Sequence, residues 1–435
     1  MYGLRRFLGV CLAVLVLIPP VTAVSTTYEN QSSLKPSLKW FRTFGGGYLD
    51  ESMSVVIDDL GNIYVATKAF SYQKDAFYLL KYSPNGDLLW NKSCKVSNAD
   101  YASPSSLVIN NIGDIYLAGT SLNSTVNHRS VVLIKYDASG TYLWNRTWNN
   151  GSDYASAYGI SMDSIGRIYI TGAIKVPSKL TDIFLLKYDS DGNLIWNKSQ
   201  GGLYLDESRG LVTLKTDNVC ICGFKNDTSV DNTVILTQAY NSMGDIDWSK
   251  TYGSGGYFGY GINVSSLDDI FVVGSNPSGD TQLVKYNSTG DLKWERHWSS
   301  GLPCDFLGVA SSYDGNFTYA TGHETGGKLI LLKYDKDGNF IWNTSWHSRT
   351  DNQGYSLGGS VAVNRSGEIY VVGKTVEPPG DPNSKAVILK FVEVAVPEFV
   401  TVILPTITLM AIFIVIRKRR KKDDSNRLCP SGRGS

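Results

Sequence analysis

Five aspartates stand close to short apolar segments that recur along the chain, and their carboxylates are the side chains best suited to act together. They are Asp50, Asp100, Asp153, Asp206 and Asp305. Carboxylates that converge attract Ca²⁺, which binds several oxygen ligands at once. The alternative is that each aspartate accepts hydrogen bonds within its own turn and stabilises that turn alone. The choice depends on whether the fold brings the five positions to one place.

The sequence shows no catalytic constellation. None of its four histidines pairs with another at metal-ligand spacing, and it contains no nucleophile elbow, phosphate loop or paired Cys-X-X-Cys motif. His323 is expected in a loop after an apolar segment that ends at Gly322. Cys220 and Cys222 are expected at packing positions of a strand. We therefore predict no catalytic residues and no resident cofactor, with Ca²⁺ as the ion that the aspartates would bind.

Glycosylation sequons are the strongest surface signal. Twelve Asn-X-Ser/Thr sequences occur, more than the composition would give by chance. Four of them directly follow a recurring tryptophan: Asn91, Asn145, Asn197 and Asn343. We expect these four to carry glycans on an exposed outer strand. The alternative is that asparagine and serine or threonine merely suit an edge strand.

These residues belong to a unit that the chain repeats. Tryptophan recurs at intervals of about 50 residues, namely Trp40, Trp90, Trp144, Trp196, Trp248, Trp294 and Trp342. Between successive tryptophans come an apolar segment, an Ile-Tyr-Val type segment such as 61–65, and a Lys-Tyr pair such as Lys81 and Tyr82. Asp- or Asn-rich turns with glycine, which suit hairpins, separate them. Each unit therefore predicts four short strands, with the tryptophan on the outermost.

Seven such units predict an all-β fold, a seven-bladed β-propeller of four-stranded blades. A tryptophan strand at 38–44 precedes the first complete unit, and the last unit ends after Phe391 without one. We expect the N-terminal strand to complete the last blade and close the ring. A β-solenoid is the alternative repeat architecture, but its rungs are usually shorter.

In a propeller the five aspartates would ring one mouth of the central channel, where ligands commonly bind. All ten tryptophans fall on predicted outer strands. We expect them to fill the widening gap between blades, because a residue repeated in every blade serves the packing of the repeat. An aromatic binding cage is the alternative.

Both ends of the chain carry membrane signals. Two arginines, an apolar run and small residues predict a signal peptide, with an uncleaved anchor and twin-arginine export as alternatives. An uncharged apolar stretch of transmembrane length precedes six consecutive cations, which place the following tail in the cytoplasm. The expected order is signal peptide 1–23, linker 24–37, propeller 38–392, tether 393–398, one transmembrane helix 399–416 and basic cytoplasmic tail 417–435.

The repeated unit resembles the seven-bladed β-propeller repeats (SBBP repeats) of bacterial and archaeal surface and secreted proteins. The resemblance rests on residues 50–52 and 58–65 and their equivalents, and covers 38–392, with the fourth to sixth copies diverged. Pro397, Glu398 and Phe399, followed by the apolar stretch and the basic cluster, resemble archaeal sorting signals of the PEF type. The resemblance implies surface display and binding, and cleavage near Pro397 by a sorting enzyme, but no reaction.

The sequence thus predicts a single-pass protein of the cell membrane with an extracellular propeller, acting in binding, adhesion or envelope structure. Its expected partners are the membrane, through the span, and a glycan or surface-protein ligand. A formal net charge of +1 gives no basic surface for nucleic acid. The alternative is an extracellular propeller enzyme, a quinoprotein dehydrogenase or a glycan-cleaving enzyme. No repeat carries the channel-facing tryptophans or catalytic side chains that those enzymes need.

Overall fold

The computed structural model describes residues 34–45, 50–69, 76–94, 96, 99–226, 232–348, 355–376 and 384–395. The predicted signal peptide, transmembrane helix and cytoplasmic tail lie outside these residues, as do most of the linker and half of the tether. Within the described ranges, no helix is long and apolar enough to cross a bilayer.

The described chain folds into seven antiparallel sheets of four strands, which we number as blades 1 to 7. Blades 1 to 3 are β2 Glu51–Ile57, β3 Ile63–Ala69, β4 Ala76–Tyr82 and β5 Leu88–Cys94; β6 Tyr101–Ile109, β7 Ile115–Asn123, β8 His128–Tyr136 and β9 Tyr142–Trp148; β10 Ala155–Met162, β11 Ile168–Ile174, β12 Asp182–Tyr188 and β13 Leu194–Gln200. Blades 4 and 5 are β14 Glu207–Thr213, β15 Val219–Asn226, β16 Thr233–Tyr240 and β17 Ile246–Tyr252; β18 Phe258–Val264, β19 Ile270–Ser275, β20 Thr281–Tyr286 and β21 Leu292–Trp298. Blades 6 and 7 are β22 Cys304–Ser311, β23 Phe317–Glu324, β24 Lys328–Asp335 and β25 Phe340–Trp346; β26 Tyr355–Val363, β27 Ile369–Val376, β28 Ser384–Ala395 and β1 Leu34–Phe44.

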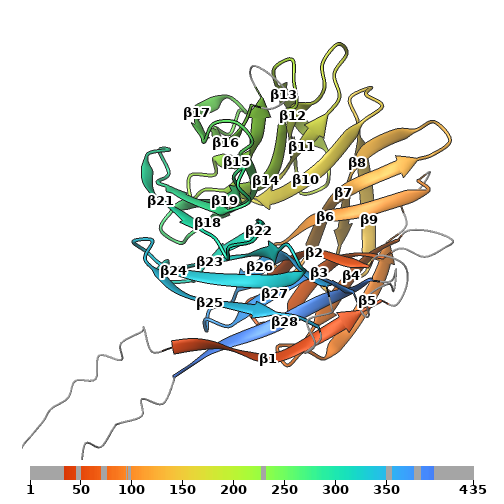
Figure 1. The fold of residues 1–435 in the computed structure, drawn as a ribbon. Helices are drawn as coiled ribbons and strands as arrows, with labels where there is room; N and C mark the ends of the chain where they lie inside the picture. Colours follow the sequence, from red (N-terminus) through yellow and green to blue (C-terminus); the bar gives the residue numbers. More distant parts are fainter. Residues whose placement is uncertain are drawn as a thin grey trace, which may run out of the picture. The chain divides into compact units, whose positions relative to one another are not determined.

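The sheets form a closed ring, which confirms the seven-bladed propeller. The first strand of each blade is innermost and contacts the innermost strands of both neighbouring blades, including β2 against β26. The sheet order β1-β28-β27-β26 places the N-terminal strand on the outside of blade 7, as the sequence predicted. Figure 1 shows this closure as the red β1 lying beside the blue β28.

The core lies between the blades. The middle strands read as apolar runs because a neighbouring blade covers each of their faces, so every residue of β11 and β12 is buried. One buried cluster combines Tyr116 and Leu133 of blade 2 with Ile170 and Phe184 of blade 3. This packing uses the hydrophobic effect all around the ring and needs no disulfide, in keeping with the free, buried thiols of Cys220, Cys222 and Cys304.

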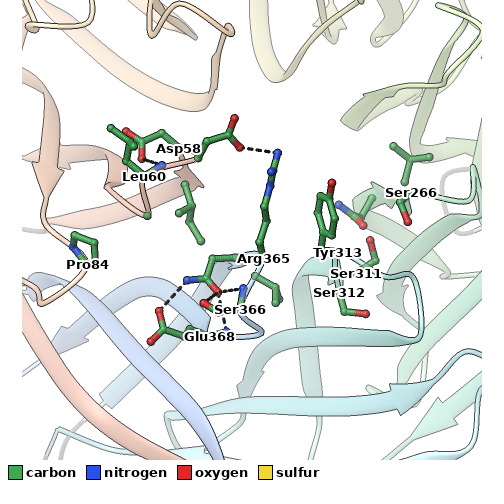
Figure 2. A pocket seen from close by; sticks show the side chains of 17 residues that line it. Asp58, Leu60, Pro84, Ser266, Ser311, Ser312, Tyr313, Arg365, Ser366 and Glu368 are labelled. Atoms are coloured by element: carbon green, nitrogen blue, oxygen red, sulfur yellow. Dashed lines mark hydrogen bonds and ion pairs between the residues drawn. The ribbon is translucent and has the colours of Figure 1, made fainter.

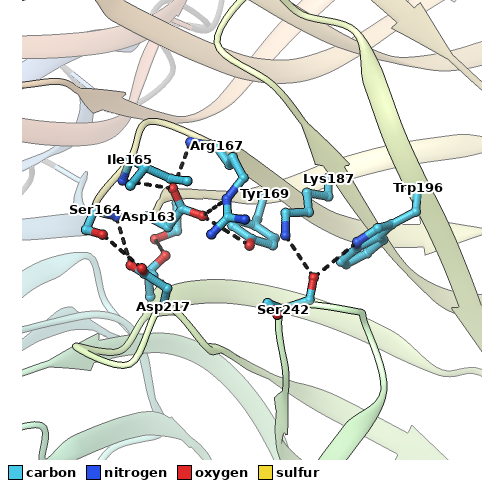
Figure 3. Close-up of polar contacts among 11 residues, drawn as sticks. Asp163, Ser164, Ile165, Arg167, Tyr169, Lys187, Trp196, Asp217 and Ser242 are labelled. Atoms are coloured by element: carbon cyan, nitrogen blue, oxygen red, sulfur yellow. Dashed lines mark hydrogen bonds and ion pairs between the residues drawn. The ribbon is translucent and has the colours of Figure 1, made fainter.

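Polar contacts join several blades to the turn between the two outer strands of the next blade. In Figure 3, Lys187 Nζ and Trp196 Nε1 of blade 3 both donate to the backbone carbonyl of Ser242 in blade 4, at 2.8 and 3.4 Å. The same carbonyl position accepts from Lys285 and Trp294 at the contact between blades 5 and 6. The repeated lysine and tryptophan therefore serve the scaffold.

The glycine of this turn is needed where the tryptophan packs. Gly192 has a φ of +80°, and a Cβ atom there would lie 2.7 Å from the Trp144 ring of the preceding blade. Gly86, Gly140, Gly244, Gly290 and Gly338 meet the preceding tryptophan in the same way. The Asp-Gly turns seen in the sequence thus make a close approach as well as a hairpin. The prediction that the recurring tryptophans fill the gap between blades is confirmed.

The contact between blade 6 and the closing blade, blade 7, is made by a different group. Blade 7 has no turn after β28, because its outer strand comes from the other end of the chain. The carboxylate of Glu393 takes the place of the turn carbonyl. It accepts from Lys333 Nζ at 2.7 and 2.8 Å and from Trp342 Nε1 at 2.8 Å.

Candidate functional site

Every inner strand carries one β-bulge at an equivalent place. The pairing between first and second strands skips one residue in each blade: Met53, Ser105, Tyr158, Arg209, Tyr260, Leu307 and Gly359. We call these the bulge residues. A bulge leaves one residue unpaired and re-aims its side chain. The inner strands surround the ring axis, so the fold presents one unpaired residue per blade to the central channel.

Six of the seven bulge residues line one cavity of about 600 Å³, which we call the strand-start cavity. It spans blades 1 to 6 and opens on the side where the inner strands begin. Its other lining residues include Tyr101, Lys68 and Arg129, at the start or end of neighbouring strands. No aspartate or glutamate is among the described residues that line it.

Arg209 is the most constrained charged group of the cavity. It pairs with Glu207, whose side chain is only 8% exposed, while 33% of the Arg209 side chain remains exposed. Its guanidinium carbon lies 4.3 Å from the Tyr158 ring centroid and 5.5 Å from that of Phe224. Such stacking fixes the plane of the guanidinium and leaves its free edge for a planar anion.

Burial shapes the acid–base properties of this group of residues. Burial raises the pKa of Glu207, and the Arg209 charge opposes that rise. Burial also raises the pKa of the Tyr158 phenol, and the Glu207 charge raises it further. Tyr158 Oη lies 3.5 Å from Tyr154 Oη, and Arg129 stacks over Tyr154 at 5.3 Å. The Tyr158 phenol is therefore neutral at neutral pH and can act as a hydrogen-bond donor.

A second cavity lies at the other end of the channel, among the turns between first and second strands. This turn-side cavity has a volume of about 750 Å³ and is lined by blades 1, 5, 6 and 7. Figure 2 shows Arg365 extending beside the Tyr313 ring, with its guanidinium carbon 4.9 Å from the ring centroid and its Nη2 atom 3.0 Å from Asp59 Oδ1. Both charged side chains are largely exposed, so this ion pair contributes little to stability.

The five predicted aspartates lie at the end of the channel where the inner strands begin, but not at one repeated position. Asp50 and Asp206 stand three residues before a bulge residue, Asp100 and Asp153 stand five before, and Asp305 lies within β22 two residues before Leu307. None of the five lines the strand-start cavity.

The contacts of the Asp100, Asp153 and Asp206 carboxylates are local, whereas the Asp50 backbone contacts another blade. The Asp100 carboxylate accepts from Ser124 N at 2.7 Å, and that of Asp206 accepts from Asn226 N at 2.9 Å, each within its own blade. Asp153 Oδ2 lies 3.3 Å from Lys175 Nζ, also within its blade. Asp50 donates its backbone N–H to Ser384 O of blade 7. No group of three or more His, Cys, Asp or Glu residues in the described ranges has the geometry to hold a metal ion.

His323 is placed differently from its prediction. The expected loop position is wrong, because β23 continues to Glu324 and pairs His323 with Asp305. Burial lowers the pKa of the imidazole, and Asp305, at 4.0 Å, opposes the shift. Cys220 and Cys222 are buried in β15, so their predicted packing role is confirmed.

The four predicted glycosylation positions all lie on outermost strands. Asn91, Asn197 and Asn343 are exposed, and Asn145 is half-buried with its amide donating to Tyr142 Oη at 2.8 Å. Asn226, another sequon asparagine, is fully buried. Attachment at the three exposed positions requires no rearrangement of the blade.

The bulge residues were not recognised from the sequence. A signal exists, because the residue after the bulge is glycine in four blades: Gly159, Gly210, Gly261 and Gly308. A Cβ atom at Gly159 would lie 3.0 Å from the backbone nitrogen of Leu211 in the next inner strand. A varied residue before a repeated glycine, in the middle of an inner strand, therefore marks the position.

Comparison with known proteins adds little. No family model matches this chain, and no curated protein matches its sequence. Among the solved structures that it resembles is Raptor of Chaetomium thermophilum, with 9% sequence identity and a TM-score of 0.49. The match covers 80% of this chain and 28% of that one, so this chain spans under a third of that protein's length. At this level the likeness says nothing about function.

Proposed function

We propose that this chain is a binding protein whose ligand occupies the strand-start cavity. A single observation carries the proposal: six bulge residues line one cavity, and they are of five different types. Residues that hold the blades together repeat, as the lysine and tryptophan contacts do, because every blade needs them. Side chains that vary at one repeated, channel-facing position are therefore not required for packing in every blade and are available for binding. A volume of about 600 Å³ suits a small ligand.

The proposal includes display at the cell surface, and here the support is in the sequence. The signal peptide at 1–23, the apolar stretch at 399–416 and the basic tail at 417–435 would hold the propeller outside the membrane. The resemblance to SBBP repeats and to archaeal sorting segments, and the exposed sequons, fit the same location. Protease treatment of intact cells should digest the propeller and spare the tail, and glycosidase should lower the mass of the chain.

The ligand test uses the full-length chain in detergent, screened against glycans and surface polysaccharides with and without Ca²⁺. We expect Tyr158→Ala and Tyr260→Ala to abolish binding of any ligand that the wild type takes up. Tyr313→Ala, in the turn-side cavity, is the matched control and should leave binding unchanged. Loss of binding only in the Tyr313 variant would move the site to the other mouth and reject the proposal.

The same screen tests the calcium hypothesis. Replacing Asp50, Asp100, Asp153, Asp206 and Asp305 with Asn removes every carboxylate that the sequence placed near the channel. Calcium-dependent binding that disappears in this variant, while its thermal melting stays unchanged, would support a calcium site there. Binding that is equal with and without calcium would reject it.

A further inference from the structure

We infer that the strand-start cavity selects a ring-shaped ligand with a carboxylate, of the class of acidic sugars, and that Arg209 and Arg129 bind the carboxylate. This inference rests on the proposed binding function and names its ligand class. It follows from the charges, the aromatic faces and the hydroxyl groups that the fold brings to one cavity.

The charged side chains that line the cavity are all cationic. Three cations line the cavity, Lys68, Arg129 and Arg209, and no described carboxylate does. Glu207 stands behind Arg209 and is almost wholly buried, so it orients the guanidinium without lining the cavity. Arg129 is exposed, stacks on Tyr154, and has no carboxylate within ion-pair distance among the described residues. An anion that enters therefore meets positive charge that is already in place.

Guanidinium groups favour carboxylates for geometric reasons. Their planar fork donates two parallel hydrogen bonds to the two oxygens of a carboxylate. The Arg209 guanidinium carbon lies over the Tyr158 ring at 4.3 Å and the side chain pairs with Glu207, so little side-chain entropy remains to be lost when it binds. A neutral hydroxyl group has one oxygen and cannot accept this pair of parallel hydrogen bonds.

The rest of the lining suits a sugar ring. Tyr101, Tyr158 and Tyr260 contribute aromatic surface, on which the apolar face of a sugar ring can pack. Hydroxyl groups of Ser103 and Thr120 lie in the same lining and provide partners for ring hydroxyls. Within the protein, Ser103 Oγ donates to Pro104 O at 3.5 Å, and Thr120 Oγ1 accepts from Ala157 N at 3.1 Å. Each hydroxyl keeps further hydrogen-bonding capacity for a ring hydroxyl. An aromatic acid would use the arginines and tyrosines but not these hydroxyl groups, so the acidic sugar uses more of the lining.

The test compares three probes on the full-length chain in detergent by titration calorimetry: oligogalacturonate, the same oligosaccharide with its carboxyl groups reduced, and benzoate. We expect oligogalacturonate to bind about tenfold or more tighter than the reduced form, as for a charge-assisted hydrogen bond. Affinity should fall as salt increases. Equal binding of both oligosaccharides, or preference for benzoate, would overturn the inference.

Variants test the assigned residues. Arg129→Gln should weaken oligogalacturonate binding by about tenfold and leave thermal melting unchanged, because Arg129 is exposed. Glu207→Gln combined with Arg209→Gln removes the ion pair without leaving a lone buried charge, and should also weaken binding. Arg365→Gln, at the turn-side cavity, is the control of equal charge and should bind as wild type.

The two proposals fail in distinguishable ways. Wild-type affinity in both arginine variants would overturn the inference. If a neutral ligand then binds and is lost in Tyr158→Ala, the proposed function stands while the ligand class is wrong. If no ligand responds to any change in the strand-start cavity, both are wrong.

Discussion

Replacement of Glu393 by Gln tests how the ring is closed. Lys333 is 1% exposed at its side chain, and its Nζ atom has both carboxylate oxygens of Glu393 within 2.8 Å. In blades 2, 5 and 7 the equivalent lysine pairs with an acidic residue just before the second strand, as Lys135 does with Asp114 and Lys285 with Asp269. Blade 6 has Asn316 at that place, so Glu393 is the carboxylate on which Lys333 depends.

The magnitude follows from this burial. Removing one partner of a buried ion pair costs about 3–5 kcal/mol, because the other charge stays buried without compensation. The Glu393 side chain is 15% exposed, so water can reach part of the vacated site, and the lower end of the range applies. The Lys333 ammonium also keeps its contact with the Phe317 ring, at 3.6 Å. We therefore expect a loss of about 3 kcal/mol, or a fall of Tm by roughly 4 °C for a domain of this size.

Tryptophan fluorescence during thermal and chemical unfolding measures the effect, because Trp342 donates to the same carboxylate. Glu368→Gln is the matched control: its partner, Lys390, keeps the carbonyl of Pro84 as an acceptor at 3.1 Å, so this change should cost less. Lys333→Met combined with Glu393→Gln removes both charges and should recover most of the loss. Equal destabilisation by Glu393→Gln and Glu368→Gln, or no recovery in the double variant, would refute this account of the closure.

Three further predictions concern the scaffold. Gly192→Ala should destabilise the chain more than Gly166→Ala in chemical denaturation. Both glycines have a positive φ, but of the two only Gly192 would place a Cβ atom against a tryptophan ring. Equal losses of stability would show that backbone strain alone accounts for the effect. Burial raises the pKa of Tyr334 to about 12, so its contribution is complete below the unfolded pKa of about 10 and is lost as pH rises towards 12. The phenolate absorbance of Tyr334, measured as the difference between wild type and Tyr334→Phe, should therefore appear only with unfolding in that interval, and earlier ionisation of this residue would contradict the burial. Cys220 and Cys222 are fully buried and their thiol pKa values are raised by burial, so mass spectrometry should find them unmodified by iodoacetamide until the chain unfolds.

Much of the fold could be predicted because its determinants are local and repeated. The tryptophan, the Lys-Tyr pair and the Asp-Gly turn recur in nearly every unit, and each marks one strand or hairpin. Closure by β1 followed from counting strands at the two ends of the chain. What Glu393 does could not be predicted, because its partners Lys333 and Trp342 come from another blade and the contact occurs only once.

The candidate site was harder to predict for a related reason. The five aspartates are acidic and close to inner strands, but their distances along the chain from the bulge differ, so they do not form one structural layer. The layer that does form consists of bulge residues, whose side chains share no chemistry across Met53, Tyr158 and Arg209. A search for repeated residues misses such a layer, because its positions repeat while its residue types do not.

Residues that repeat in the blades stabilise the fold, whereas the bulge residues vary in type and line the channel. The repeated polar contacts between blades come from middle and outer strands, such as those of Lys187 and Trp196 with Ser242, and these residues do not line the strand-start cavity. A bulge residue is left out of the ladder between first and second strands, so its replacement breaks no pairing in that ladder. Ligand preference can therefore change at most of the bulge positions that line the strand-start cavity without loss of ladder pairing. Ser105 is one exception, because its hydroxyl donates to Ala157 O of blade 3 at 2.6 Å. Arg209 is another, because its removal alone would leave the buried Glu207 carboxylate unpaired. A change at Arg209 should therefore affect binding and stability together.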